Sequence, residues 1–288
     1  MPELPEVETV RVQLWAKLRG RTISKVIVHD RKTVGGDLSF ARKLRGLKFA
    51  DIERVGKLLI FRFEDRPDRC LLGHLKMTGQ FFYTERNALT AGGGHSLDAS
   101  EFKQLPDRHT RVSIATDADG VLHFNDQRKF GFLKLADAAA VAAAKLRFGP
   151  EPIASDFDHK DFARKLRARK TNVKAALLDQ SFVAGLGNIY VDETLFAAKI
   201  KPDRSAASLT EREALYIAKS AGAILKQAIK SGGTTFQHFI DAEGKRGSYV
   251  NKLKVFGRQG LPCPRCGATI RKTRVAGRGT HFCPNCQK

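Results

Sequence analysis

The 288-residue sequence lacks any apolar run that approaches the ~20 residues of a membrane-spanning helix. Its N-terminal segment also lacks the basic and then apolar pattern of a secretory signal peptide. From these two absences we predict a soluble, cytosolic protein. No internal repeat is present, which excludes a solenoid. Hydrophobic residues nevertheless make up 42% of the chain, enough for a sizeable core and for two ordinary domains.

Acidic residues are scarce. The 30 Asp and Glu stand against 51 Lys and Arg, which gives a net charge of +21 and an isoelectric point near 10.0. Residues 251–288 hold nine basic residues and no acid. A second basic cluster precedes a glycine-rich turn and consists of Arg164, Lys165, Arg167, Arg169, Lys170 and Lys174. Because phosphate charges supply most non-specific DNA affinity, this distribution favours a nucleic-acid partner over a generically basic surface.

The first half of the chain predicts a helix followed by strands. Apolar residues recur at helical spacing from Pro5 to about Leu18, and Gly20 ends the pattern. From Thr22 to about Leu135, short apolar or alternating runs predict strands, with a hairpin turn at residues 117–120. Residues 87–104 are expected to form a long mobile loop. We therefore predict a β-sandwich with flanking helices.

The second half is predominantly helical. An alanine-rich helix at residues 138–146 is followed by the break Gly149-Pro150-Glu151-Pro152, where we place a domain boundary. The helices expected beyond it span residues 159–170, 173–178, 188–198 and 208–229. Ser208 and Glu211 have the spacing of a capping box for the last of these.

Four of the five cysteines form two Cys-x-x-Cys pairs separated by sixteen residues, the spacing of a structural zinc site. They are Cys263, Cys266, Cys283 and Cys286. The intervening residues 269–280 can form a β-hairpin, and a reducing cytosol favours one structural Zn²⁺ over disulfides. Cys70 is expected to be a buried core thiol, and His281 a surface residue beside the finger.

The glycine-rich segment Gly185–Tyr190 lies between two predicted helices. Its glycines allow close approach of another polymer, and amides at the start of the second helix, together with Asn188, are suited to holding a phosphate. This arrangement resembles a helix-turn-helix. An ordinary turn between helices is the alternative interpretation.

The chain begins Met1-Pro2-Glu3, so removal of Met1 would leave a secondary amine next to a carboxylate. An α-amine titrates near pH 7.7–8.0, well below lysine, and much of a free Pro2 amine would be unprotonated and nucleophilic. Taken alone, these residues favour a purely structural interpretation, with Pro5 in the first turn of a helix.

Seven segments carry a resemblance that spans nearly the whole chain. They are MPELPEVETV at the start, GKLL at 56–59, HLKMTG at 74–79, NDQRKFG at 125–131, GLGNIYVDE at 185–193, SGGTTF at 231–236, and the four-cysteine finger. In this order and combination they closely resemble the formamidopyrimidine-DNA glycosylase family. Each short motif is unspecific alone, but the combination is highly specific.

The resemblance refines the predicted fold into an α+β, multidomain protein. Residues 1–148 would form the N-terminal β-sandwich catalytic domain, and residues 149–250 a helical helix-two-turn-helix DNA-binding domain with the lesion loop. Residues 251–288 would form the zinc finger with its β-hairpin. Residues 231–247 match a mobile loop that closes over an everted purine.

The resemblance implies a bifunctional glycosylase and AP lyase that removes 8-oxoguanine and formamidopyrimidines from double-stranded DNA. Pro2 would attack C1′ of the damaged nucleotide and form a Schiff base, while Glu3 would protonate the ring oxygen. Glu6 matches a supporting position in the catalytic site. Lys57 and Arg278 match the proton donors for successive β- and δ-eliminations.

The family's DNA contacts match two further groups of residues. Met77, Arg128 and Phe130 match a wedge that fills the hole left by the everted nucleotide, although core packing would also suit Met77 and Phe130. Positions that grip the DNA backbone match His74, His109, Arg169, Lys174, Asn188 and Arg278.

One departure from the family pattern concerns Arg111, which stands where the family often has a second histidine after His109. Two alternatives to the main interpretation are an endonuclease VIII-like enzyme for oxidised pyrimidines and a non-catalytic zinc-containing DNA-binding protein. We expect a monomer in the cytoplasm, associated with the nucleoid.

Overall fold

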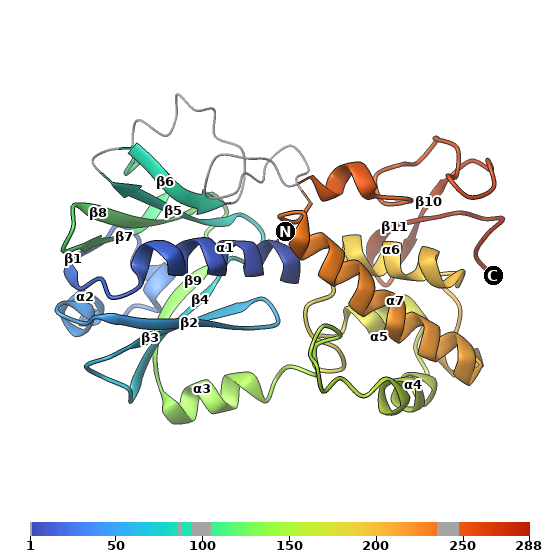
Figure 1. The fold of residues 1–288 in the computed structure, drawn as a ribbon, viewed down its shortest axis with the longest axis horizontal. Coiled ribbons are helices and arrows are strands. Elements are labelled where there is room, and N and C mark those ends of the chain that lie inside the picture. Colours follow the sequence, from blue (N-terminus) through green and yellow to red (C-terminus); the bar gives the residue numbers. More distant parts are fainter. Residues whose placement is uncertain (1, 86–87, 94–104, 235–247) are drawn as a thin grey trace. The chain divides into compact units, whose positions relative to one another are not determined.

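The computed structural model describes residues 2–85, 88–93, 105–234 and 248–288, with the backbone alone for 88–93, and divides into two compact units (Figure 1). Unit 1 comprises Met1–Leu146 and Ser231–Ser248, and unit 2 comprises Arg147–Lys230 and Tyr249–Lys288. The chain therefore leaves unit 1, builds most of unit 2, and returns to unit 1 for a short segment. The mixed α+β architecture confirms the predicted fold class.

Unit 1 is a sandwich of two antiparallel sheets. The five-stranded sheet has the order β1-β7-β8-β5-β6, and the four-stranded sheet the order β2-β3-β4-β9. The strands are β1 (Ile23–Val28), β2 (Phe49–Val55), β3 (Leu58–Phe63), β4 (Arg69–His74), β5 (Gly79–Glu85), β6 (Ala88–Gly93), β7 (Thr110–Thr116), β8 (Gly120–Asp126) and β9 (Phe132–Asp137). The helices are α1 (Leu4–Leu18), α2 (Phe40–Leu44) and α3 (Ala138–Lys145).

Aromatic side chains fill the space between the two sheets. Phe61 of the four-stranded sheet meets Phe81 of the five-stranded sheet edge-on, with ring centroids 5.7 Å apart, and Phe81 contacts Phe124 at 5.0 Å. All three are buried. Such pairs stabilise a core beyond the area that they bury.

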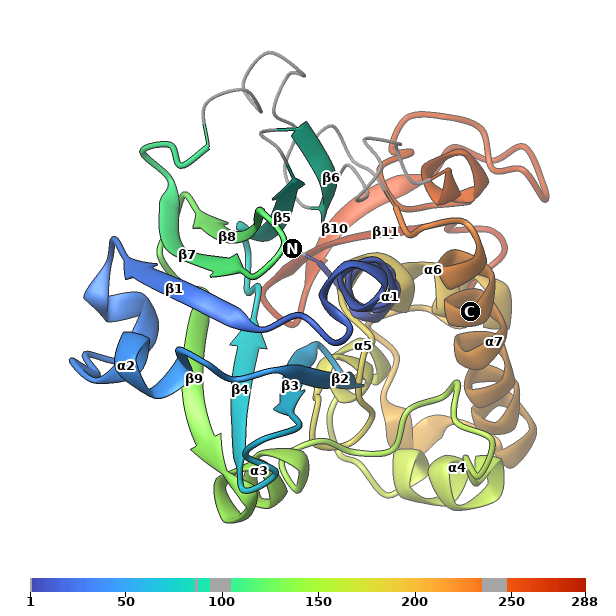
Figure 2. The same ribbon diagram turned by 60° about the vertical axis from the view of Figure 1, so that its left-hand side comes forward.

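Helix α1 fixes the start of the chain. Its residues Leu4, Val7, Val10, Leu14 and Leu18 are buried at the helical period that the sequence predicts. The helix contacts β2 and β3 of one sheet and β5 and β6 of the other (Figure 2). The N-terminal residues therefore extend from a helix that both sheets hold in place.

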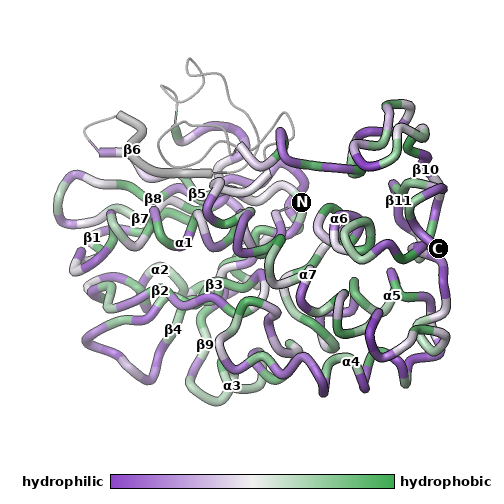
Figure 3. Tube along the Cα trace, turned by 45° about the vertical axis from the view of Figure 1, so that its right-hand side comes forward, coloured by the Kyte–Doolittle hydropathy of each residue, from purple (hydrophilic) through white to green (hydrophobic). Residues whose placement is uncertain are grey.

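Unit 2 combines a helical core with a hairpin. Its elements are α4 (His159–Arg167), α5 (Val173–Leu178), α6 (Asn188–Ala198), α7 (Glu211–Lys230), β10 (Arg271–Val275) and β11 (Arg278–Phe282). Helices α4 and α6 both pack on α7. The mainly hydrophilic α4 (Figure 3) turns only Phe162, Ala163 and Leu166 inward.

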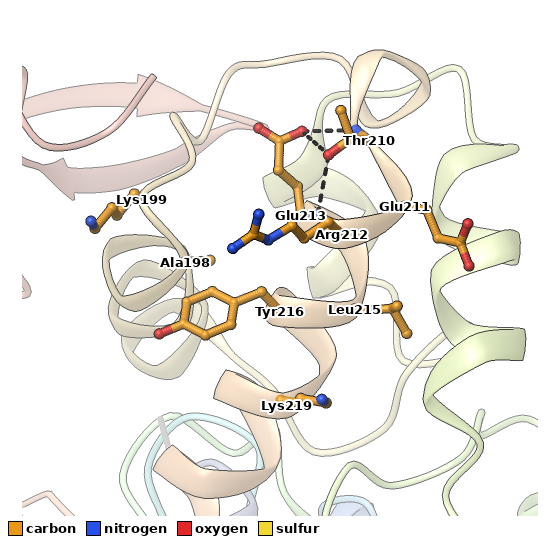
Figure 4. A pocket seen from close by; sticks show the side chains of 9 residues that line it. All are labelled: Ala198, Lys199, Thr210, Glu211, Arg212, Glu213, Leu215, Tyr216 and Lys219. Carbon is orange, nitrogen blue, oxygen red and sulfur yellow. Dashed lines mark hydrogen bonds between the residues drawn. The ribbon is translucent and has the colours of Figure 1, made fainter.

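The structure corrects two predictions about local elements. Ala88–Gly93, expected to be part of a mobile loop, forms β6 and pairs with β5, whereas residues 87 and 94–104 lie outside the described residues. The capping box of α7 is formed by Thr210 and Glu213 and not by Ser208 and Glu211. Figure 4 shows the Glu213 carboxylate turned back onto Thr210. Thr210 follows a short 3₁₀ helix at Ala206–Ser208, which moves the start of α7 along the chain.

A substitution at Gly222 can show whether close packing outweighs helix propensity in α7. A Cβ atom at this position would lie 2.6 Å from the carbonyl oxygen of Pro152, a backbone atom that has little freedom to move. In an open helix, Gly→Ala stabilises by about 1 kcal/mol. We expect Gly222→Ala to lower the free energy of unfolding, by about 1–3 kcal/mol, in urea denaturation. The control is Ala223→Gly at the exposed neighbouring site, which should cost about 1 kcal/mol through propensity alone. A stabilised Gly222→Ala protein would contradict this account.

Candidate functional site

Glu6 connects the start of α1 to a distant segment of unit 1. Its Oε2 accepts a hydrogen bond from the Glu3 backbone N–H at 2.8 Å. Its Oε1 accepts from the backbone N–H and the hydroxyl of Thr234, at 2.7 and 2.9 Å. A Cβ on Gly233 would lie 2.7 Å from Glu6 Oε1, so the second glycine of the SGG motif provides the room that this carboxylate needs. The predicted supporting residue therefore holds the backbone beside Pro2 in place.

Glu3 and Lys57 are both buried. Glu3 is the N-cap residue of α1 and forms a capping box with Glu6. It is 2% exposed, and Lys57, in the turn between β2 and β3, is 6% exposed. Gly56 makes this turn with a left-handed backbone, φ +58°. The two groups predicted to transfer protons are thus confined by their surroundings and not free in solvent.

The three predicted wedge residues lie on two neighbouring turns of unit 1, and Arg128 contacts the other two. Arg128 Nη1 lies 3.1 Å from Met77 Sδ, and the Arg128 guanidinium stacks over the Phe130 ring at 4.8 Å from its centroid. Phe130 is 52% exposed. Core packing therefore does not account for Phe130, because a core aromatic ring would be covered.

His74 is held in its neutral form. Burial, assisted by the positive charges of Lys76 and Lys57, lowers the pKa of His74 to about 3. Its Nδ1 accepts the backbone N–H of Lys76 at 2.9 Å, so the neutral ring carries its proton on Nε2. A neutral imidazole with this tautomer is a hydrogen-bond donor through Nε2, as a phosphate contact requires.

His109 is half-buried, next to Arg108, whose Nε lies 3.1 Å from His109 Nε2.

The lowered pKa of His74 predicts a loss of stability in acid. Between pH 6.5 and about 3, the unfolded chain binds a proton at His74 that the folded chain does not, so stability falls as the pH falls. Relative to pH 7, this group should cost about 1–2 kcal/mol at pH 5. Urea denaturation at both pH values should show a smaller acid loss for His74→Gln than for the parent. His159→Gln, in unit 2, is the control, and an equal reduction in both variants would contradict the assignment.

Lys174 is fully buried in unit 2, so its predicted role as a direct phosphate contact requires correction. Its Nζ lies 2.7 Å from Asp192 Oδ1 and 3.3 Å from the carbonyl oxygen of Gly279, and both charged side chains have no exposed surface. Asn188 Nδ2 donates to the same Gly279 carbonyl at 2.9 Å. The two residues thus fix the hairpin of the finger against α5 and α6.

His281 is also buried, contrary to expectation. Its backbone N–H donates to Asp192 Oδ2 at 2.8 Å, which adds the second strand of the hairpin to the same network. Arg278, at the start of β11, is exposed. Arg169 pairs with Asp179 at 2.8 Å and stacks on the Phe182 ring at 4.3 Å. The basic cluster at 164–174 is therefore partly neutralised within unit 2, and Arg278 remains more accessible to a phosphate.

The sequence analysis assigned no role to Asp192 and Glu193, although both stand in the GLGNIYVDE segment. Glu193 accepts hydrogen bonds from the backbone amides of Lys254, Val255 and Phe256 at 2.9–3.1 Å. It therefore anchors the chain that leads into the finger. The signal available in the sequence was a pair of adjacent acids in a mostly apolar helix, since an acid that is buried there needs hydrogen-bond partners.

The four cysteines converge as predicted. All four Sγ atoms lie within 4.8 Å of one another, with Cys263–Cys286 at 3.9 Å and Cys266–Cys283 at 3.6 Å. Zn–S bonds of about 2.3 Å in a tetrahedron place sulfur atoms about 3.8 Å apart, so the donor set fits one structural Zn²⁺. Four protein ligands leave no open position for reactive chemistry. Cys70 is 1% exposed and burial raises the pKa of its thiol, which confirms it as a buried core thiol.

Loss of the metal should release the hairpin that carries Arg278. We expect Cys266→Ser to lower the zinc content from one ion per chain and to reduce DNA affinity at least tenfold. Zinc content can be measured by atomic emission and affinity by fluorescence anisotropy. Cys70→Ser is the matched control and should retain full zinc content. Full zinc content and unchanged affinity in Cys266→Ser would refute the assignment.

A hollow of about 950 Å³ lies on unit 2 beside the start of α7 (Figure 4). It is lined by the half-exposed Tyr216 and by Ala198, Lys199, residues 210–213, Leu215 and Lys219. None of the predicted site residues lines it. The residues that carry the proposed chemistry are therefore not gathered in this hollow.

Comparison with known proteins identifies the class of each part of the chain. Residues 1–133 match the model described as Formamidopyrimidine-DNA glycosylase N-terminal domain, and residues 148–240 match the H2TH domain of the same family. Residues 260–288 match a zinc finger found in FPG and IleRS. A β-sandwich followed by a helix-two-turn-helix domain and a zinc finger is thus the architecture of a DNA glycosylase.

None of the helices in the described parts of the chain combines the length and the apolar character needed to cross a membrane.

The similarity extends over whole chains. The formamidopyrimidine-DNA glycosylases of Desulfitobacterium hafniense and Heliobacterium modesticaldum are 40% and 41% identical, with 100% coverage of this chain and of each relative. The Lactococcus lactis Fpg bound to N7-benzyl-Fapy-dG DNA is 40% identical with a TM-score of 0.87, and its complex with abasic DNA is 38% identical with a TM-score of 0.86. In both comparisons the similarity covers 100% of this chain and 100% of the Lactococcus lactis chain. The chain belongs to the formamidopyrimidine-DNA glycosylase family, the DNA glycosylases and AP lyases of base-excision repair.

Proposed function

We propose that this protein excises oxidised purines from double-stranded DNA through a Schiff base on Pro2, and then cleaves the strand at the lesion. The observation that carries this proposal is the 2.8 Å hydrogen bond by which Glu6 holds the backbone of Glu3, the residue that follows Pro2 and caps α1. The complexes of the Lactococcus lactis relative with Fapy-dG-type and abasic DNA support the substrate class.

The proposed chemistry begins with the free amine of Pro2, after removal of Met1. The nitrogen lone pair forms a bond to C1′, the purine leaves with the electrons of the glycosidic bond and gains a proton, and the Pro2 nitrogen gives up its own proton. Glu3 then donates a proton to O4′ as the C1′–O4′ bond breaks, which opens the sugar and leaves an iminium between Pro2 and C1′.

Strand cleavage follows from the electron-withdrawing iminium. Loss of a C2′ proton expels the 3′ phosphate by β-elimination, and a second elimination expels the 5′ phosphate, so a one-nucleotide gap remains. We assign the proton donors of these two steps to Lys57 and Arg278. Hydrolysis of the iminium releases the sugar fragment and restores the Pro2 amine.

The DNA contacts of this proposal fall on exposed and half-buried residues. Met77, Arg128 and Phe130 would enter the duplex where the damaged nucleotide leaves it, and the exposed, stacked Phe130 supports this role. His74, His109, Asn188 and Arg278 would contact the DNA backbone. The protein would act as a monomer in the cytoplasm, on nucleoid DNA.

Borohydride trapping tests the proposed nucleophile and the substrate class together. We expect reduction to trap a covalent complex with a duplex that contains 8-oxoguanine, and to trap less with one that contains an oxidised pyrimidine. Pro2→Gly should abolish trapping, and Glu3→Gln should slow base release at least 100-fold, the usual scale for a catalytic acid.

Two results of this experiment, and one of a mass measurement, would decide against the proposal. Preferential trapping with the oxidised pyrimidine would favour an endonuclease VIII-like enzyme. DNA binding without any trapping would favour a non-catalytic DNA-binding protein. Intact-mass spectrometry that finds Met1 on the fully active protein would exclude Pro2 as the nucleophile.

A further inference from the structure

Two turns carry the three wedge side chains, and both turns pass from one sheet of the sandwich to the other. The Met77 turn (residues 75–78) joins β4 to β5, and the Phe130 turn (residues 127–131) joins β8 to β9. Each turn contains a non-glycine residue with left-handed backbone, Lys76 at φ +52° and Lys129 at φ +56°. This conformation is unfavourable for lysine and persists only where the surroundings enforce it.

The Asp126 carboxylate holds both turns. It is 1% exposed, its Oδ1 accepts a hydrogen bond from the Thr78 hydroxyl, and its Oδ2 accepts the Gly131 backbone N–H at 2.6 Å. The Arg128 backbone N–H lies 3.0 Å from Thr78 Oγ1 and 3.2 Å from Asp126 Oδ1, and so completes the connection. One buried side chain thus receives donors from the turn of Met77 and from both ends of the Phe130 turn.

Arg111 holds the backbone of the same residue, Asp126. It is 7% exposed, its Nε donates to the Asp126 carbonyl oxygen at 2.8 Å, and its Nη1 donates to the Arg108 carbonyl oxygen at 3.2 Å. The guanidinium therefore points into the protein and connects the His109 segment to Asp126. A phosphate cannot reach a side chain that is buried in this way.

We propose that Asp126, Thr78 and Arg111, here called the Asp126 clamp, are positioning residues that hold the two wedge turns at one fixed spacing, and that Arg111 does not contact the DNA backbone. This inference rests on the proposed wedge role of Met77, Arg128 and Phe130. A wedge must enter the base stack as a preformed unit, because disorder in its side chains would have to be removed at each eversion. The clamp therefore acts on the eversion step and not on the chemistry at C1′.

A pair of near-identical substitutions at Thr78 isolates this effect. Thr78→Val keeps the shape of the side chain and removes the hydroxyl, whereas Thr78→Ser keeps the hydroxyl. In single-turnover assays, we expect Thr78→Val and Asp126→Asn to slow release of 8-oxoguanine about tenfold or more. Thr78→Ser should remain within about threefold of the parent.

The comparison substrate is a duplex with a preformed abasic site, which needs no base to be unstacked. On this substrate, strand cleavage and borohydride trapping by the same variants should change less than about threefold. Fluorescence of 2-aminopurine opposite the lesion should report slower wedge insertion in Thr78→Val. Ser113→Ala is the matched control, since Ser113 is a buried hydroxyl on the same strand as Arg111 and bonds His29 and His123 but neither turn.

Two substitutions separate the effect of the charge of Arg111 from the effect of its hydrogen-bond geometry. A lysine keeps the charge but cannot make the two-point contact, so Arg111→Lys and Arg111→Met should slow base release equally. The slope of log affinity against log salt should match the parent in both. A phosphate contact would instead predict rescue by lysine and a slope smaller by about one in Arg111→Met.

The outcomes separate this inference from the proposed function. Equal losses on both substrates, or no loss in Thr78→Val and Asp126→Asn, would overturn the clamp while the parent remains active. Rescue by Arg111→Lys with a reduced salt slope in Arg111→Met would overturn the role of Arg111. A parent protein that processes neither substrate would overturn the proposed function and this inference with it.

Discussion

The Glu6 carboxylate is the interaction on which the proposed chemistry depends most. Chain termini are usually poorly ordered, and a nucleophile at the second residue would lose its geometry if the terminus frayed. Here the buried carboxylate of Glu6 joins the Glu3 backbone to Thr234, which lies 228 positions beyond Glu6 in the chain. The apolar face of α1, packed on both sheets, fixes the helix itself. A flexible end of the chain is thereby converted into a fixed part of unit 1.

The same segment explains why the SGG motif needs its second glycine. Gly233 has a left-handed backbone, φ +81°, and any Cβ there would press on Glu6. The motif therefore serves the N-terminus as well as the loop that follows it. Sequence reasoning placed these residues in a loop that closes on the lesion, and residues 235–247 of that loop lie outside the described residues. What the structure adds is the attachment of the start of this loop to α1.

Periodicity and spacing predicted the elements, but not the partners of buried polar groups. The helical period of Val7, Val10 and Leu14 and the Cys-x-x-Cys spacing are local signals, and the structure confirms both. Lys174 and His281 were expected to be accessible because charge and hydropathy assign such residues to the surface. Their shared partner Asp192 is distant from His281 in sequence, and only the fold brings them together. The β6 strand was missed because its glycines predict a loop when the pairing with β5 is unknown.

Four buried acids order loops and turns of this basic chain through hydrogen bonds to backbone amides. Glu6, Asp126, Asp192 and Glu193 are all buried. Glu6, Asp192 and Glu193 accept hydrogen bonds from backbone amides of segments that are distant in sequence. Asp126 accepts them from the turn that follows its own strand. A buried carboxylate without partners is strongly unfavourable, so each one specifies the loop conformation that satisfies it. Lysines and arginines could not do this, because they lack acceptor atoms for backbone amides. In a protein with a net charge of +21, acids that are withdrawn into such loops order the site while the surface remains cationic.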